Sequence, residues 1–314
     1  MGVTILARSG ILLVDKPQGL TSHDVVARVR RLAGTRKVGH AGTLDPMATG
    51  LLILGLNSST RLLTYLVGLD KEYFATIRLG VATNTDDAEG EQTEVAPVSR
   101  VAGLAEADVA REVGALTGAI SQRPSSVSAI KVGGKRAYSL VRAGESVELA
   151  ARPVTIFAFD VLGFRREPGV LDVDVRVECS SGTYVRALAR DLGAALGVGG
   201  HLTALRRSRV GPFSVADSMQ LPDAAGASGG DASGGDVADS LMAPAAVATR
   251  LFPSLALTGS EVIDLAHGKR IEAPLPDSGP IAALAPDGRL VALVSVAGGI
   301  AKSLVVFPAD EVLA

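Results

Sequence analysis

Apolar residues occur in short runs separated by polar, glycine-rich turns, and the spacing within each run predicts a mixture of strands and helices. Strands are expected at residues 11–14, 51–56, 73–79 and 171–179, the last alternating strictly between apolar and polar positions. Helical spacing predicts helices at residues 22–33, 60–69, 104–116 and 183–196. The first helix is expected to begin at a Thr21 or Ser22 cap and to end at Gly34. Residues 81–94 are polar and are expected to form turns.

The pattern changes towards the C-terminus. Residues 224–236 are a run of Gly, Ala, Ser and Asp that cannot build a core, which indicates a flexible linker. Beyond it, short strand-like runs between residues 255 and 307 predict a small β-barrel or sandwich. We therefore expect a large α/β or α+β domain at 1–222, a connecting segment at 223–250 and a small β domain at 251–314.

Composition narrows the class of protein. The chain has 314 residues, of which 47% are hydrophobic, so it can bury a sizeable core. Its single cysteine, Cys179, excludes an intramolecular disulfide and any zinc site built on a cysteine pair. The four histidines lack metal-ligand spacing, and no Walker loop or nucleophile-elbow motif is present. No apolar stretch is long enough to span a bilayer, so a soluble cytoplasmic protein is expected.

Charge is nearly balanced overall but uneven along the chain. The formal net charge is -2, which argues against a general polyanion binder. Basic residues nevertheless gather in three groups: Arg28, Arg30, Arg31, Arg36 and Lys37; Lys131, Lys135, Arg136 and Arg142; Arg186, Arg190, Arg206, Arg207 and Arg209. Such groups can neutralise phosphates, although ordinary solvated surface explains them as well.

The stretch at residues 39–50, GHAGTLDPMATG, surrounds one carboxylate with glycines. Asp45 before Pro46 is typical of a helix N-cap, with proline at the first helical position. The alternative is a carboxylate presented to a substrate, which the glycines and the polar neighbours His40 and Thr43 favour. The residues alone leave both interpretations open.

A second group, SGTYVR at residues 181–186, lies where the strand at 171–179 should turn into a helix. Arg186 could orient a carboxylate, and Tyr184 could transfer a proton or stack on a ring. A half-buried tyrosine and a surface arginine are the structural alternative.

Taken together, several motifs resemble the bacterial TruB family, the tRNA pseudouridine synthases that act on the T-loop uridine. They are VDKPQGLTS at 14–22, GHAGTLDPMATG at 39–50, DKEY at 70–73, QRP at 122–124 with SAIK at 128–131, SGTYVR at 181–186 and LRR at 205–207. The resemblance covers residues 10 to 215. It implies an α+β pseudouridine-synthase fold, with a mixed, largely antiparallel sheet flanked by helices, and a PUA-like C-terminal β-barrel module.

The resemblance also implies roles for individual residues. Asp45 matches the catalytic aspartate, a covalent nucleophile that attacks either uracil C6 or ribose C1′. Arg186 matches the arginine that pairs with it and keeps it ionised, and Tyr184 matches the tyrosine proposed to remove the C5 proton. Tyr73 would stack on the base, His40 would hold the flipped-out uridine at position 55, and Leu205 would line the base pocket.

The implied partner is tRNA, contacted at its T-loop and T-stem by a monomer that needs no metal and no cofactor. Phosphate contacts are expected from Arg36, Lys37, Arg206 and Arg207. Two other interpretations stay open at this point: an RNA-folding chaperone without chemistry, and a structural Asp45 cap in an unrelated nucleotide-binding fold.

Overall fold

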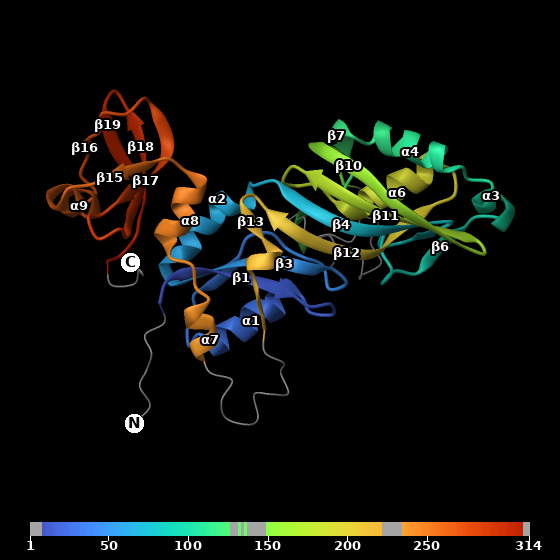
Figure 1. The fold of residues 1–314 in the computed structure, drawn as a ribbon, viewed down its shortest axis with the longest axis horizontal. Coiled ribbons are helices and arrows are strands. Elements are labelled where there is room, and N and C mark those ends of the chain that lie inside the picture. Colours follow the sequence, from blue (N-terminus) through green and yellow to red (C-terminus); the bar gives the residue numbers. More distant parts are fainter. Residues whose placement is uncertain (1–7, 126–130, 133–134, 137–148, 222–233, 310–314) are drawn as a thin grey trace. The chain divides into compact units, whose positions relative to one another are not determined.

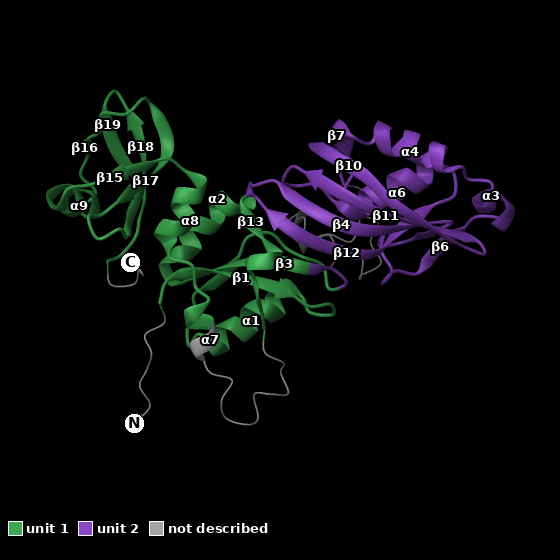
Figure 2. Ribbon diagram, in the orientation of Figure 1, with its two compact units in different colours: residues 1–46, 50–67, 212–314 green, residues 47–49, 68–211 purple. Residues whose placement is uncertain are grey.

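The computed structural model describes residues 8–125, 131–132, 135–136, 149–221 and 234–309. The chain forms two compact units (Figure 2). Unit 1 combines residues 1–46, 50–67 and 212–314, and unit 2 combines residues 47–49 and 68–211. Residues 128–130 of the quoted motifs and residues 224–233 of the predicted linker lie outside the described part. Among the described residues, no helix is long and apolar enough to cross a membrane.

Unit 1 begins with a group of four paired strands. Strand β1 (Gly10–Lys16) pairs antiparallel with β3 (Thr49–Leu56), which also pairs with β2 (Val38–His40), and β14 (Met219–Gln220) lies parallel to β1. Helix α1 (Ser22–Leu32) starts at a capping box, in which Thr21 and Asp24 satisfy each other's backbone N–H groups. The predicted strands at 11–14 and 51–56 and the predicted first helix are confirmed. The helix expected at 60–69 is a 3₁₀ turn (η1, Asn57–Leu62) followed by α2 (Leu63–Val67).

The C-terminal part of unit 1 is a five-stranded sheet in the order β15-β17-β18-β19-β16 (Figure 1). Its strands are β15 (Ser254–Ala256), β16 (Ile271–Glu272), β17 (Ser278–Leu284), β18 (Leu290–Ala297) and β19 (Ile300–Val306). A core of small aliphatic side chains fills it, closed by α9 (Gly259–Ala266) through the buried Leu265. This confirms the predicted small β module.

Four short elements connect this module to the rest of the chain: β13 (Phe213–Ser214), η2 (Val215–Asp217), α7 (Gly234–Asp239) and α8 (Pro244–Leu251). The end of the predicted linker, residues 234–236, is therefore the start of a helix rather than a loop.

Unit 2 is built on one antiparallel sheet in the order β12-β4-β11-β10-β7. These strands are β4 (Lys71–Leu79), β7 (Gly118–Gln122), β10 (Arg152–Glu167), β11 (Val170–Cys179) and β12 (Gly200–Val210). Helix α4 (Glu106–Ala115) packs against β10, and α6 (Val185–Ala195) packs against β12 and β4. The predicted fold class, a largely antiparallel sheet flanked by helices, is confirmed.

Smaller elements complete unit 2: α3 (Val98–Ala102), a hairpin of β8 (Lys131–Val132) and β9 (Lys135–Arg136), and a hairpin of β5 (Val81–Thr83) and β6 (Gln92–Val95). The expectation that residues 81–94 form only turns is therefore wrong at both ends of that segment. The turn between β5 and β6 carries two buried acids, Asp86 and Asp87.

Helix α6 approaches the sheet so closely that one position on it must be glycine. A Cβ added at Gly193 would lie 2.2 Å from the carbonyl carbon of Gly199 and 2.3 Å from the nitrogen of Gly200. Because these are backbone atoms, a side chain at 193 would force helix and strand apart.

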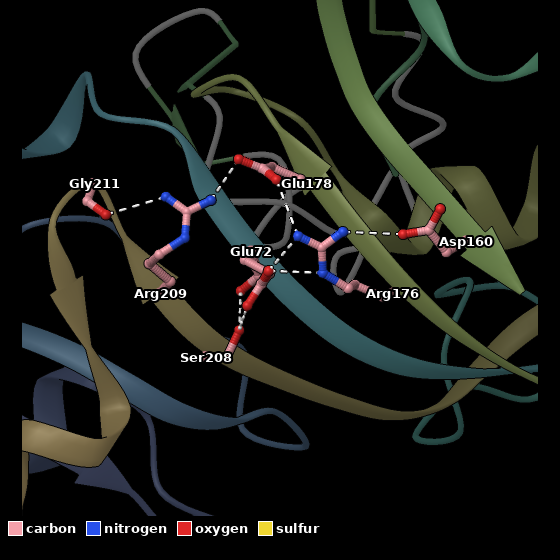
Figure 3. A network of polar contacts seen from close by, with 7 residues as sticks. All are labelled: Glu72, Asp160, Arg176, Glu178, Ser208, Arg209 and Gly211. Atoms are coloured by element: carbon pink, nitrogen blue, oxygen red, sulfur yellow. Dashed lines mark hydrogen bonds and ion pairs between the residues drawn. The ribbon is translucent and has the colours of Figure 1, made fainter. Parts of the chain in front are cut away.

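The opposite face of the unit 2 sheet carries a ladder of ion pairs (Figure 3). Arg176 binds Glu72 at 2.6 Å, Asp160 at 2.9 Å and Glu178 at 3.1 Å, and Arg209 binds Glu178 at 2.5 Å. These side chains come from four neighbouring strands, β4, β10, β11 and β12. Because the cations and carboxylates of this network pair with one another across the strands, this face of the sheet can stay in contact with water.

Candidate active site

Asp45 lies in a loop between β2 and β3, and the residue is half-buried. Residues 46 and 47 form a turn and strand β3 begins at Thr49, so no helix follows Pro46. The N-cap interpretation of Asp45 is therefore wrong. Gly42 in the same loop has φ 91°, a left-handed conformation that favours glycine.

The backbone on either side of Asp45 is held by buried polar side chains of the same unit. The Leu44 N–H donates to the Ser22 hydroxyl at 2.9 Å, and this hydroxyl donates to the Leu44 carbonyl at 3.0 Å. On the other side, the Pro46 carbonyl accepts from the Lys16 ammonium at 3.3 Å and from the Gly19 N–H at 2.8 Å. These bonds restrict the backbone on both sides of Asp45, a typical requirement for a reacting group.

His40, at the end of β2, is half-buried beside the exposed His23 of α1. Their rings meet edge to face, with centroids 5.6 Å apart. Arg36 and Lys37, which precede β2, are both exposed. Arg36, Lys37 and His40 therefore lie within nine positions of Asp45 in the sequence, and His23 directly follows Ser22, which binds Leu44.

Tyr184 and Arg186 lie at the start of α6, as predicted. Tyr184 is the N-cap residue and is half-buried, whereas Arg186 is 4% exposed. The Arg186 Nη1 donates to the Thr85 carbonyl at 2.9 Å and to Asp87 Oδ2 at 3.2 Å. Arg186 is thus a buried cation in a defined orientation, not the surface arginine of the structural alternative.

Asp87, which no sequence motif marks, is a carboxylate that binds Arg186. Its Oδ1 accepts from the Thr85 hydroxyl at 2.6 Å and from the Glu89 N–H at 3.1 Å, which leaves Oδ2 directed at Arg186. The signal in the sequence was the polar segment 83–90, TNTDDAEG, in which Asx-type turns are frequent.

The neighbouring Asp86 makes a second link from this turn to α6. It adopts φ 60° and binds Arg190 at 3.2 Å. Burial raises the pKa of Asp86, and the charge of Arg190 opposes that rise.

Tyr73 and Leu205 share the buried face of the unit 2 sheet. Tyr73 of β4 lies directly opposite Arg207 of β12, and Leu205 lies opposite Ala75, two residues further along β4. Tyr73 and Leu205 are each 8% exposed. Because successive strand residues alternate between faces, Tyr73, Leu205 and Arg207 lie on one side of the sheet.

The four residues predicted to contact phosphates differ in exposure. Arg36 and Lys37 are exposed, and Arg206 is half-buried with its Nη1 3.4 Å from the Thr49 hydroxyl. Arg207 is 1% exposed, so its guanidinium does not lie at the surface, where a phosphate would be met. The LRR motif at 205–207 lies in strand β12, in which alternate residues point inward.

Comparison with known proteins decides the family. A model described as TruB family pseudouridylate synthase (N terminal domain) matches residues 30–185. Two further models match residues 186–243, as tRNA pseudouridylate synthase B C-terminal domain, and residues 252–308, as tRNA Pseudouridine synthase II, C terminal. The tRNA pseudouridine synthase B of Leifsonia xyli subsp. xyli is 58% identical over 97% of this chain and 98% of its own length. The chain belongs to the TruB family.

Other TruB relatives and solved structures agree with this assignment. The tRNA pseudouridine synthase B of Thermobifida fusca is 54% identical over 95% of this chain and 98% of its own length. A chain of a Cbf5-Nop10-Gar1 complex has a TM-score of 0.69 at 26% identity and covers 99% of this chain and 89% of its own. A chain of an H/ACA RNP bound to a substrate RNA has the same TM-score of 0.69 at 24% identity, covering 100% of this chain and 90% of its own, and shows the fold alone.

Membership of the TruB family confirms the resemblance drawn from the motifs, and with it the enzyme class: a pseudouridine synthase, which is an isomerase. Asp45 belongs to unit 1, whereas Tyr73, Tyr184, Arg186 and Leu205 belong to unit 2. The pairing of Asp45 with Arg186 stays a prediction. Within the described residues, no three His, Cys, Asp or Glu side chains form a group that could hold a metal ion.

Proposed function

We propose that this TruB enzyme converts the T-loop uridine of tRNA, at position 55, into pseudouridine, with Asp45 as the covalent nucleophile. The observation that carries the proposal is near-full-length identity of 58% to a tRNA pseudouridine synthase B. The half-buried Asp45, in a loop fixed on both sides by Ser22 and Lys16, supports the role of the carboxylate. We further propose a monomer that acts in the cytoplasm without a metal or a cofactor.

The reaction exchanges one bond to the ribose for another. The N1–C1′ bond breaks, the uracil turns, a C5–C1′ bond forms, and the C5 proton leaves while N1 gains one. Asp45 attacks at C6 of the uracil or at C1′ of the ribose, and in both routes its carboxylate departs again at the end, so atoms balance without a redox partner. A flipped-out uridine is required because the stacked base keeps these atoms out of reach.

Arg186 would hold the Asp45 carboxylate ionised and oriented. Its guanidinium has five N–H donors in a planar fork, and Asp87 and Thr85 engage Nη1 at one end of that fork. This arrangement fixes the plane in which the Nε and Nη2 donors lie, and bidentate contact with a carboxylate needs such a fixed plane.

Tyr184 would take the C5 proton, while Tyr73 would stack on the uracil and Leu205 would line its pocket. The shared sheet face of Tyr73 and Leu205, and the packing of α6 against β4 and β12, support this grouping. His40 would hold the extruded nucleotide. Arg36, Lys37 and Arg206 would contact phosphates; affinity for tRNA that does not change between low and moderate salt would exclude those contacts.

Tritium release tests the proposal. A T-stem-loop RNA carrying [5-³H]uridine should release tritium with the wild-type enzyme, whereas Asp45→Asn should reduce release to background with an unchanged melting temperature. The matched control is Asp264→Asn, which removes an exposed carboxylate of α9 that binds Lys269, and it should retain the wild-type rate. Asp45→Asn at the wild-type rate would remove the nucleophile assignment, and a silent wild type would remove the proposed reaction.

A further inference from the structure

The side chain of Gln122 binds both backbone groups of Tyr184. The Tyr184 N–H donates to Gln122 Oε1 at 2.8 Å, and Gln122 Nε2 donates to the Tyr184 carbonyl at 3.1 Å. Gln122 is the last residue of β7 and is 2% exposed. Both residues lie in unit 2, although 62 positions separate them in the sequence.

Gln122 binds the residue at which α6 begins. The Tyr184 side chain makes no cap hydrogen bond, so the start of α6 depends on other groups for its orientation. The side-chain amide of Gln122 supplies one acceptor and one donor to the Tyr184 backbone. A residue of a neighbouring β-strand would offer Tyr184 the same two groups. The next residue reinforces the link, because the Arg123 carbonyl accepts from Arg190 Nη2 at 2.7 Å.

We infer that Gln122 is a positioning residue for the isomerisation. It fixes the backbone of Tyr184 at φ -107° and ψ 106°, which sets the direction in which the tyrosine leaves the chain. Through the first turn of α6 it also sets the direction of Arg186. Gln122 need not touch the RNA, and the inference rests on the proposed function because it takes Tyr184 and Arg186 as reacting groups.

Only a neutral side chain of this length with one donor and one acceptor satisfies both bonds. Methionine fills a similar volume but leaves the Tyr184 N–H without this acceptor. An ionised glutamate keeps the acceptor but places a negative oxygen against the Tyr184 carbonyl. A protonated glutamate restores both bonds, since its hydroxyl donates to the carbonyl and its other oxygen accepts from the N–H.

The test compares Gln122→Met, Gln122→Glu and the control Thr117→Val by tritium release, RNA affinity and melting temperature. Thr117 precedes β7 and donates to the Val113 carbonyl at 3.0 Å, so its replacement removes a side-chain-to-backbone bond that involves no residue of α6. Gln122→Met should lower kcat about 10- to 100-fold with KM within twofold, because a shift of about 1 Å in a reacting group costs about 100-fold. Thr117→Val should keep the wild-type kcat.

Gln122→Glu adds a measurement, the pH dependence of the rate, that a merely structural role of Gln122 would leave unchanged. Burial raises the pKa of a carboxyl group, so the ratio of its rate to the wild-type rate should rise as the pH falls and the glutamate becomes protonated. A wild-type kcat in Gln122→Met overturns the inference, even if the melting temperature falls. If Gln122→Met does not fold, the ratio for Gln122→Glu decides, and a ratio that is flat with pH overturns it. A failure of the proposed function looks different, because wild type and Thr117→Val would both be silent.

Discussion

The hydroxyl of Ser22 binds both backbone groups of Leu44, the residue directly before Asp45. Ser22 is 1% exposed and is the first residue of α1, so the loop that presents the carboxylate is attached to a helix start. Gln122 makes the same two-bond contact with Tyr184 in the other unit. In both places a buried side chain takes the role of a missing strand partner.

Ser22→Ala should therefore lower both stability and rate. The buried N–H and carbonyl of Leu44 lose this partner, which costs about 1–3 kcal/mol in the free energy of unfolding. We expect kcat for tritium release to fall more than 10-fold, because the loop before Asp45 is released. Urea unfolding and single-turnover kinetics measure the two effects.

The control for this prediction is Thr60→Val, which removes a 2.8 Å bond to the Asn57 carbonyl in the same unit and should leave kcat unchanged. Equal losses of kcat in Ser22→Ala and Thr60→Val would contradict the argument that Ser22 fixes the loop.

Asp87→Asn should destabilise unit 2 and slow the reaction. The Arg186 and Asp87 side chains are 5% and 4% exposed, so the loss of one partner weakens the compensation of a buried charge. Breaking such a pair costs about 3–5 kcal/mol, whereas breaking an exposed pair costs about 1 kcal/mol or less. Asp108→Asn, which breaks the exposed pair with Arg111, is the control. Similar shifts in the urea midpoint for the two variants would show that the buried Arg186–Asp87 pair contributes no more to stability than the exposed Arg111–Asp108 pair.

Lys71 should make stability depend on pH in the alkaline range. Burial, with Arg207 nearby, lowers the pKa of Lys71 to about 8, below the value of about 10.4 in an unfolded chain. Between these values the unfolded state binds more protons than the folded state, so stability rises with pH across that window. The free energy of unfolding of wild type should therefore increase relative to Lys71→Met by about 1 kcal/mol per pH unit from pH 8 to 10. A difference that is constant over this range, measured by urea unfolding, would disprove the assignment.

Local patterns were enough to predict much of the fold. Strand β11 and helix α6 appeared where strict alternation and helical spacing placed them, because each buries one regular face. The long strand β10 was not located individually, since bulges after Ile156 and Val161 interrupt its alternation. The hairpin of β5 and β6 was missed because its strands have only three and four residues.

Candidate site residues could be named from the sequence only where a motif marks them. Asp45, Tyr184 and Arg186 were given roles through their motifs. Asp87 lies in no motif, and Gln122 lies in the QRP motif without a role, because both bind residues far along the chain. No spacing rule connects positions that distant. The buried Arg207 shows the reverse case, in which a basic residue within a motif faces inward because of its strand register.

The contact of Gly193 with Gly199 and Gly200 has a consequence for natural variation. The height of α6 above the sheet, and with it the height of Arg186, is set by a residue that has no side chain. Selection acting on catalysis would then preserve a glycine two helical turns away from the arginine it serves. A redesign limited to the residues proposed to contact the uridine would therefore leave out the position that sets the depth of Arg186.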